Sequence, residues 1–169
     1  MAGGLRYNAA VITAQDIVFR QATNDDGDRV IKLVSDVLLE FQLPFDLGSK
    51  DADLKDIEIA YILPGGMFEV IEDKHGRLLG TYGLFPLNSS TCELRKMYFL
   101  PEIRGIGLGR EALERAVDHA RRFGFKTIVL ETITVLERAI RLYTRFGFVP
   151  TTIDHPNPRV DQRYMLRLD

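Results

Sequence analysis

The segment of the sequence best suited to chemistry runs from Arg104 to Arg110 and has glycine at every second position. Glycine lets the backbone approach a ligand closely, and a helix is predicted to begin at the end of this segment. The first N–H groups of a helix have no partners within it and carry partial positive charge, so they bind anions such as phosphate and pyrophosphate. The two arginines add positive charge at either end. The segment therefore predicts a site for a phosphate-bearing ligand.

Two common phosphate-binding patterns fit this segment poorly. A P-loop ends in Gly-Lys-Ser/Thr, whereas Gly109 is followed by Arg110 and Glu111. A dinucleotide fingerprint counted from Gly105 would need glycine where Arg110 stands, although Glu131 ends the next predicted strand where a ribose-binding acid would lie. Antiparallel strands are predicted before the segment, and residues 101–104 separate it from the preceding strand, which is not typical of that fold. A nicotinamide-dependent oxidoreductase is therefore kept only as an alternative.

The cysteine and histidine content excludes several other kinds of site. Cys92 is the single cysteine, so the chain has no internal disulfide and no multi-cysteine zinc site, which fits a reducing compartment. The three histidines, at positions 75, 119 and 155, are scattered without the spacing of metal ligands. No metal is expected.

The composition is that of one soluble globular domain. The chain has 169 residues, of which 46% are apolar and 27% charged. A net charge of −2 gives no basic excess for wrapping nucleic acid or coating an anionic membrane. No apolar run reaches the roughly 18 residues of a membrane-spanning helix, and the first residues make a poor signal peptide. We therefore expect a cytoplasmic protein.

The pattern along the chain predicts one mixed α/β domain over residues 16–169, preceded by a loose tail or added strand over residues 1–15. Thr23 and the acidic residues after it are typical of a helix start, and a capping box is predicted at residues 134–137. Strands are predicted by β-branched or alternating runs, and helices by apolar residues at 3.6-residue spacing. The predicted strands cover residues 17–20, 67–72, 78–85, 91–100, 127–130, 148–149 and 164–168, and the predicted helices cover 30–41, 51–61, 108–123 and 134–146.

The motif Arg104-x-x-Gly107-x-Gly109 resembles the acetyl-CoA pyrophosphate motif of the GNAT superfamily of N-acetyltransferases. The strand before it, residues 93–99, and the later Ala139-x-x-Leu142-Tyr143-x-x-x-Gly147-Phe148 are similar to that family in order and spacing. The resemblance is strong over residues 93–148 and topological before them. It implies an acyl-CoA N-acyltransferase-like fold, in which a mixed, mostly antiparallel sheet has two splayed parallel strands and flanking helices.

The resemblance also implies roles for particular residues. Backbone groups at the end of the first splayed strand would bind the pantetheine arm of acetyl-CoA, and the glycine segment would bind its pyrophosphate. Tyr143 matches the tyrosine that protonates the departing thiolate, and Glu93 is our first hypothesis for the general base, with Glu131 as its alternative. Leu136 stands where the family often has an asparagine that binds the pantetheine arm. The cofactor-binding residues so implied are Met97, Tyr98, Phe99, Arg104, Gly105, Ile106, Gly107, Leu108, Gly109 and Arg110.

The function expected from the sequence is direct transfer of an acetyl group from acetyl-CoA to a primary amine of a small molecule or peptide. Phe41, Leu43, Phe45 and His155 are expected in loops that cover the acceptor in this fold. Members of the family often dimerise, so a homodimer is one state to expect. A non-catalytic acyl-CoA sensor is the second alternative, and no nucleic acid or membrane partner is expected.

Overall fold

The structure is a computed structural model, and it describes residue 13 and residues 16–168. The predicted tail or added strand over residues 1–15 therefore lies almost wholly outside the described residues. No helix in the described part of the chain is both long enough and apolar enough to cross a membrane.

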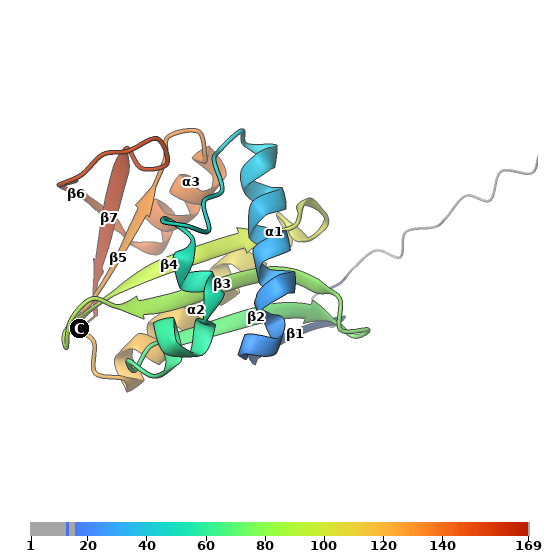
Figure 1. The fold of residues 1–169 in the computed structure, drawn as a ribbon. Coiled ribbons are helices and arrows are strands. Elements are labelled where there is room, and N and C mark those ends of the chain that lie inside the picture. The colour runs from blue at the N-terminus through green and yellow to red at the C-terminus, as the bar shows by residue number, and fades with distance from the viewer. Residues whose placement is uncertain (1–12, 14–15, 169) are drawn as a thin grey trace, which may run out of the picture.

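A seven-stranded sheet forms the centre of the molecule, with strand order β1-β2-β3-β4-β5-β7-β6 (Figure 1). Neighbouring strands are antiparallel except β4 and β5, which are parallel. This confirms the expected mixed, mostly antiparallel sheet. The strands are β1 (Ile17–Gln21), β2 (Met67–Asp73), β3 (Leu78–Pro86), β4 (Thr91–Phe99), β5 (Thr127–Thr132), β6 (Val149–Thr151) and β7 (Gln162–Arg167).

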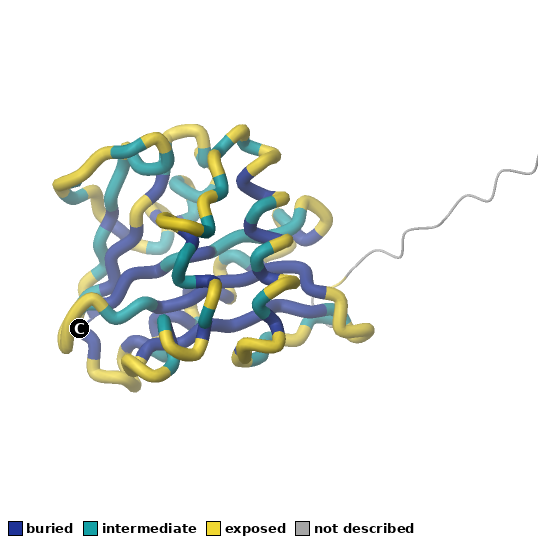
Figure 2. The backbone as a smooth tube through the Cα atoms, viewed as in Figure 1, coloured by how far each residue is buried: buried dark blue, intermediate teal, exposed yellow. Residues whose placement is uncertain are grey.

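Helices cover both faces of the sheet. Helix α1 (Gly27–Glu40) crosses one face, and α2 (Leu108–Arg122) and α3 (Glu137–Phe146) lie on the other (Figure 1). Apolar residues at 3.6-residue spacing in α2, among them Ala112, Leu113 and Ala116, pack with Leu94 and Ile128 of the central strands. The apolar stripe of α1 forms a second core on its own face, so the middle strands are buried on both sides (Figure 2). Burial on both sides fixes the positions of β4 and β5.

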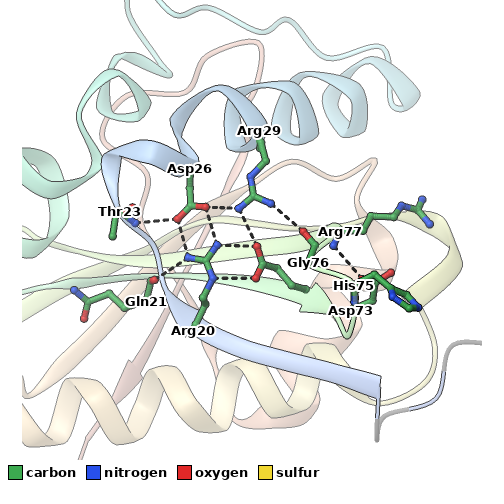
Figure 3. Close-up of polar contacts among 10 residues, drawn as sticks. Arg20, Gln21, Thr23, Asp26, Arg29, Asp73, His75, Gly76 and Arg77 are labelled. Carbon is green, nitrogen blue, oxygen red and sulfur yellow. Dashed lines mark hydrogen bonds and ion pairs between the residues drawn. The ribbon is translucent and has the colours of Figure 1, made fainter.

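A network of charged groups fixes the start of α1 on the edge of the sheet (Figure 3). Arg20 on β1 donates to both carboxylate oxygens of Asp26 at 2.8 Å and to Glu72 on β2 at 2.7 and 2.9 Å. Arg29 on α1 bonds the same two carboxylates, and the N–H of Thr23 donates to Asp26 at 3.0 Å. The acidic residues predicted to start a helix after Thr23 therefore also connect that helix to strands β1 and β2.

Two predicted helix features are wrong. The expected helix over residues 51–61 is a 3-10 turn (η3, Ala52–Lys55) and a π-helical turn (η4, Glu58–Ile62). The chain breaks between them because Asp56 is extended and its carboxylate accepts the N–H of Ile59 at 2.9 Å. The expected capping box at residues 134–137 does not form, because the hydroxyl of Thr134 accepts from Gln162 and α3 begins only at Glu137.

Candidate functional site

The two parallel strands separate towards their carboxyl ends. They pair only where Thr91 to Leu94 lie opposite Thr127 to Leu130, although β4 continues to Phe99. Just past the last pair, β4 carries a bulge: its register with β3 shifts by one residue, and Lys96 has φ +54°. A bulge bends a strand and ends regular pairing. The edge of β4 that faces β5 is therefore open from residue 95 onwards.

A cleft of about 1310 Å³ opens along this unpaired edge. It is bounded by the ends of β4 and β5, by the glycine segment, by α3, and by the chain that leaves α1. Ligand pockets of small-molecule enzymes usually measure about 300–1,000 Å³. The cleft is therefore large enough for an extended ligand together with a second, smaller molecule.

The glycine segment lines the cleft and presents unbonded backbone N–H groups. A 3-10 turn, η5 (Pro101–Ile103), follows β4, and Gly105 and Gly107 then adopt left-handed conformations with φ +82° and +95°. The N–H groups of residues 105–109 meet no acceptor among the described residues, whereas those of Arg110 and Glu111 bond to the carbonyl of Gly107 at 3.1 and 3.2 Å. We call residues 105–109 the amide nest. Such an arrangement at a helix start is suited to a pyrophosphate.

The two arginines of the motif line the same cleft, but their guanidinium groups are already paired with carboxylates. The guanidinium of Arg104 donates to both carboxylate oxygens of Glu40, at 2.6 and 2.7 Å, and to the carbonyl of Phe99 at 2.8 Å. Its side chain therefore joins the glycine segment to the end of α1. Arg110 is exposed and pairs with Glu114 one turn further along α2. The free hydrogen-bond donors of this segment are therefore the backbone N–H groups of the nest rather than the two guanidinium groups.

Tyr143 lies on α3 and lines the cleft. Its side chain is buried, and its hydroxyl lies 3.9 Å from the sulfur of Met97 on the open edge of β4. Burial, and to a lesser extent the nearby Tyr98, raises the pKa of Tyr143. The phenol is therefore protonated at neutral pH and can donate a hydrogen bond into the cleft.

The structure distinguishes the two candidate bases. Glu93 is buried and paired with Arg95, whose nitrogens lie 2.5 and 2.6 Å from one carboxylate oxygen. Glu131 lies in the cleft on β5, one residue past the last β4–β5 pair, and accepts no hydrogen bond from a described residue. Burial and the charge of Glu93 raise the pKa of Glu131. Glu131 is exposed, and it thus has a free carboxylate with a raised pKa, which suits a base.

A buried cluster around Asp51 holds Lys96 and Arg159 where they line the cleft, and no pattern in the sequence indicated this cluster. Asp51 accepts from Lys96 at 2.7 Å and from Arg159 at 2.6 and 3.2 Å. Asp53 lies 3.1 Å from the same lysine. We call the part of the cleft lined by Lys50, Glu93, Lys96, Glu131 and Arg159 the charged half.

The remaining predicted residues divide between the cleft and its surroundings. Phe41, Leu43 and Leu136 line the cleft, with Leu136 at the start of α3, where an apolar side chain offers no hydrogen bond. Phe45 packs against the core under α1, and His155 is exposed. Cys92 is buried and burial raises its pKa to about 12, so it is a core residue. The described residues contain no group of three or more side chains suited to a metal.

A mixed sheet whose only parallel strands diverge beside an amide nest is the fold of acyl-CoA-dependent acyltransferases. Residues 34–148 match the model of the acetyltransferase (GNAT) family. The chain is 39% identical to the uncharacterized N-acetyltransferase YjgM of Escherichia coli, covering 81% of this chain and 84% of that one, and 32% identical to an uncharacterized N-acetyltransferase of Schizosaccharomyces pombe, covering 83% and 86%. The chain belongs to the GNAT family of acetyltransferases.

Solved structures show the same fold. An acetyltransferase from Streptococcus agalactiae superposes with a TM-score of 0.82 at 25% identity, covering 91% of this chain and 99% of that one. An acetyltransferase from Salmonella typhimurium, solved with its cofactor acetyl-CoA, gives a TM-score of 0.72 at 24% identity, covering 91% and 95%. The alternative of a nicotinamide-dependent fold is not supported, because β4 runs antiparallel to the strand before it.

Proposed function

We propose that this protein binds acetyl-CoA in the cleft and transfers its acetyl group directly to a primary amine. The observation that carries the proposal is that one cleft holds both the open edge of β4 and the amide nest. An extended thioester carrier needs both features, because its pyrophosphate requires N–H donors and its amide-containing arm requires a strand edge. The acetyl-CoA bound to the Salmonella relative supports this proposal. The cytoplasmic location expected from the sequence remains a prediction.

In this proposal the backbone holds most of the cofactor. The N–H groups of residues 105–109 bind the pyrophosphate, and the edge of β4 at Met97 and Tyr98 pairs with the pantetheine arm. The carbonyl of Phe99 already accepts a hydrogen bond from Arg104. Phe99 therefore contributes only its N–H and its side chain to cofactor binding. Leu136 supplies an apolar contact in place of a hydrogen bond. Cofactor affinity then depends on backbone shape rather than on side-chain charge.

In the proposed reaction two side chains transfer protons: Glu131 accepts one from the acceptor, and Tyr143 donates one to the thiolate. The acceptor must lose a proton before its nitrogen attacks the thioester carbonyl, and Glu131 takes that proton, directly or through a water. The C–N bond forms, the oxyanion is stabilised by a backbone N–H of β4 near Met97, and the nitrogen, now cationic, releases its second proton to solvent. The C–S bond then breaks, and the thiolate takes its proton from Tyr143, which regains one from solvent. The contacts favour Glu131 over Glu93, whose charge instead raises the pKa of its neighbour.

The test of cofactor binding is Gly107→Glu. A glutamate here places a negative charge in the amide nest and must adopt a left-handed backbone, so acetyl-CoA binding measured by calorimetry should be lost. Gly76→Glu is the matched control, because Gly76 also has positive φ and open space around its Cα but lies in the β2–β3 turn, away from the cleft. Retention of parental affinity by Gly107→Glu would show that the cofactor binds elsewhere.

The test of catalysis is Tyr143→Phe, followed by thiol release with acetyl-CoA and a panel of primary amines. We expect turnover to fall by about 10²-fold or more with little change in acetyl-CoA affinity, as for loss of a general acid. Equal losses in turnover and affinity would indicate a packing role only. A protein that binds acetyl-CoA and releases no thiol with any amine would be the non-catalytic sensor.

A further inference from the structure

Three cations act on Glu131, and two of them, Arg163 and Lys50, are not fully neutralised by other carboxylates of the described residues. Arg163 on β7 lies directly opposite Glu131 in the antiparallel β5–β7 pair, so both side chains project from the same face of the sheet. Among the charges that act on Glu131, Arg163, Arg95 and Lys50 lower its pKa, and Glu93 raises it. Glu131 therefore has a cationic neighbour across the strand and another at the rim of the charged half.

Arg163 is incompletely paired. Its Nε is buried and has no hydrogen-bond partner among the described residues. Its other contact is with Asp154, 3.5 Å away, and that carboxylate is 72% exposed. A buried guanidinium N–H without a partner is unfavourable, because it loses its water and gains nothing in return. An anionic group of a bound ligand would supply the hydrogen-bond acceptor that Arg163 lacks.

The balance of charge argues against a polycationic acceptor. Lys96, Arg95 and Arg159 are already neutralised by Asp51, Asp53 and Glu93. Among the described residues this leaves Glu131 as the free carboxylate of the charged half and Lys50 as its free cation, and Arg163, opposite Glu131 on β7, adds a second cation beside the cleft. A polyamine carries several positive charges and needs an acidic site. One solved structure of similar fold is a spermidine N-acetyltransferase from Vibrio cholerae, at 19% identity, and its acceptor class does not suit the charges here.

We propose that the acceptor is an amino acid, whose primary amine lies beside Glu131 and whose carboxylate is bound by Arg163 and Lys50. This inference rests on the proposed function and adds the class of acceptor to it. The unpaired carboxylate of Glu131 and the incompletely paired guanidinium of Arg163 lie on adjacent strands of one face, which matches an ammonium and a carboxylate a few bonds apart. Glu131 both binds the ammonium and removes its proton.

The experiment compares matched acceptors by thiol release. Each amino acid is paired with its own amide, which keeps the amine and side chain but lacks the carboxylate, and spermidine is included. We expect kcat/KM to be about 10- to 100-fold higher for the acids, the range for losing a charge-assisted hydrogen bond. The amides have the less basic amine, which works against the expected result and makes it harder to obtain by accident.

Two variants locate the carboxylate site. Arg163→Gln should remove the preference for the acid, because it slows the reaction with the acid much more than the reaction with the amide. Arg167→Gln is the matched control: it lies four residues further along β7 on the same face, opposite Thr127 and away from the cleft, and should keep the preference.

The outcomes separate the two proposals. Equal use of amides or preferred use of spermidine would overturn the inference and leave the acetyltransferase proposal standing. Equal slowing of acid and amide by Arg163→Gln would also overturn it. If acetyl-CoA does not bind, or no acceptor releases thiol, the proposed function fails and the inference falls with it.

Discussion

Replacing Asp51 with alanine should destabilise the protein more than any change to an exposed charge. Its carboxylate is fully buried and accepts four hydrogen bonds, one from the N–H of Asp46, one from Lys96 and two from Arg159. Removing one partner of a buried ion pair costs about 3–5 kcal/mol, because the other charge stays buried and unpaired. Lys96 keeps Asp53 at 3.1 Å, whereas Arg159 loses both its bonds to Asp51, so we expect about 3 kcal/mol.

Equilibrium unfolding in urea at pH 7 measures this loss. For a chain of this size, each kcal/mol corresponds to roughly 2–4 °C in Tm, so the Asp51→Ala variant should melt about 6–12 °C lower. The control is Asp36→Ala, which breaks an exposed pair with Lys32 and should change the free energy of unfolding by about 1 kcal/mol or less. A loss for Asp51→Ala no larger than the control's would refute a buried, structurally required cluster.

The difference in free energy of unfolding between the parent protein and Asp51→Ala should depend on pH. Burial alone would raise the pKa of Asp51, but hydrogen bonds from Arg159, the N–H of Asp46 and Lys96 outweigh it, and the net pKa is lowered. A carboxyl whose pKa is lower in the folded state contributes stability above its unfolded pKa of about 3.9 and loses it as the pH falls further. The difference between parent and Asp51→Ala should therefore be constant from pH 7 to about pH 5 and shrink below pH 4. A difference that grows on acidification would contradict this assignment.

Two further substitutions test the scaffold under the site. Asp26→Ala should cost about 1–3 kcal/mol in urea unfolding, because Arg20 and Arg29 lose one carboxylate but keep Glu72; a cost near zero would mean that the network in Figure 3 does not hold α1 on the sheet. Gly66→Ala should cost about 3 kcal/mol or more by the same measurement, since the added Cβ would lie 2.1 Å from a backbone carbonyl oxygen of β3. Gly27→Ala meets only an ordinary contact at 4.0 Å and should be nearly neutral, and similar losses for both glycines would disprove the steric reasoning.

The elements that position the site were largely predictable, because their patterns are local. The apolar spacing of α2 and its glycine-rich start predicted a helix over 108–123, and the structure begins it at Leu108. The diverging β4 and β5 came from the family resemblance rather than from periodicity. The segment after Asp51 was predicted as a helix because its long-range contacts are invisible to a local pattern: Asp51 bonds partners 45 and 108 residues away.

The choice between Glu93 and Glu131 as the base could have been made better from the sequence itself. Residues two apart on a strand share a face, so the Glu93–Arg95 pair was in principle readable from the sequence. Because Arg95 neutralises Glu93, the free carboxylate of Glu131 is the better candidate for the base. Glu131 has no such partner because of the strand order β5-β7-β6 and the separation of β5 from β4. Both depend on several elements, so the sequence of one element does not predict them.

The bulge at Lys96 connects the two halves of the site. In a regular strand Arg95 and Lys96 would point to opposite faces. Here both reach Asp53, at 3.9 and 3.1 Å, because the left-handed conformation of Lys96 turns its side chain to the α1 side. The residue that interrupts the regular path of β4, beside the edge proposed for the cofactor, therefore also supplies the cation that holds Asp51 in the opposite wall. Backbone strain at this one position is compensated by a buried ion pair. The shape of the open edge of β4 and the charges of the charged half therefore cannot change independently.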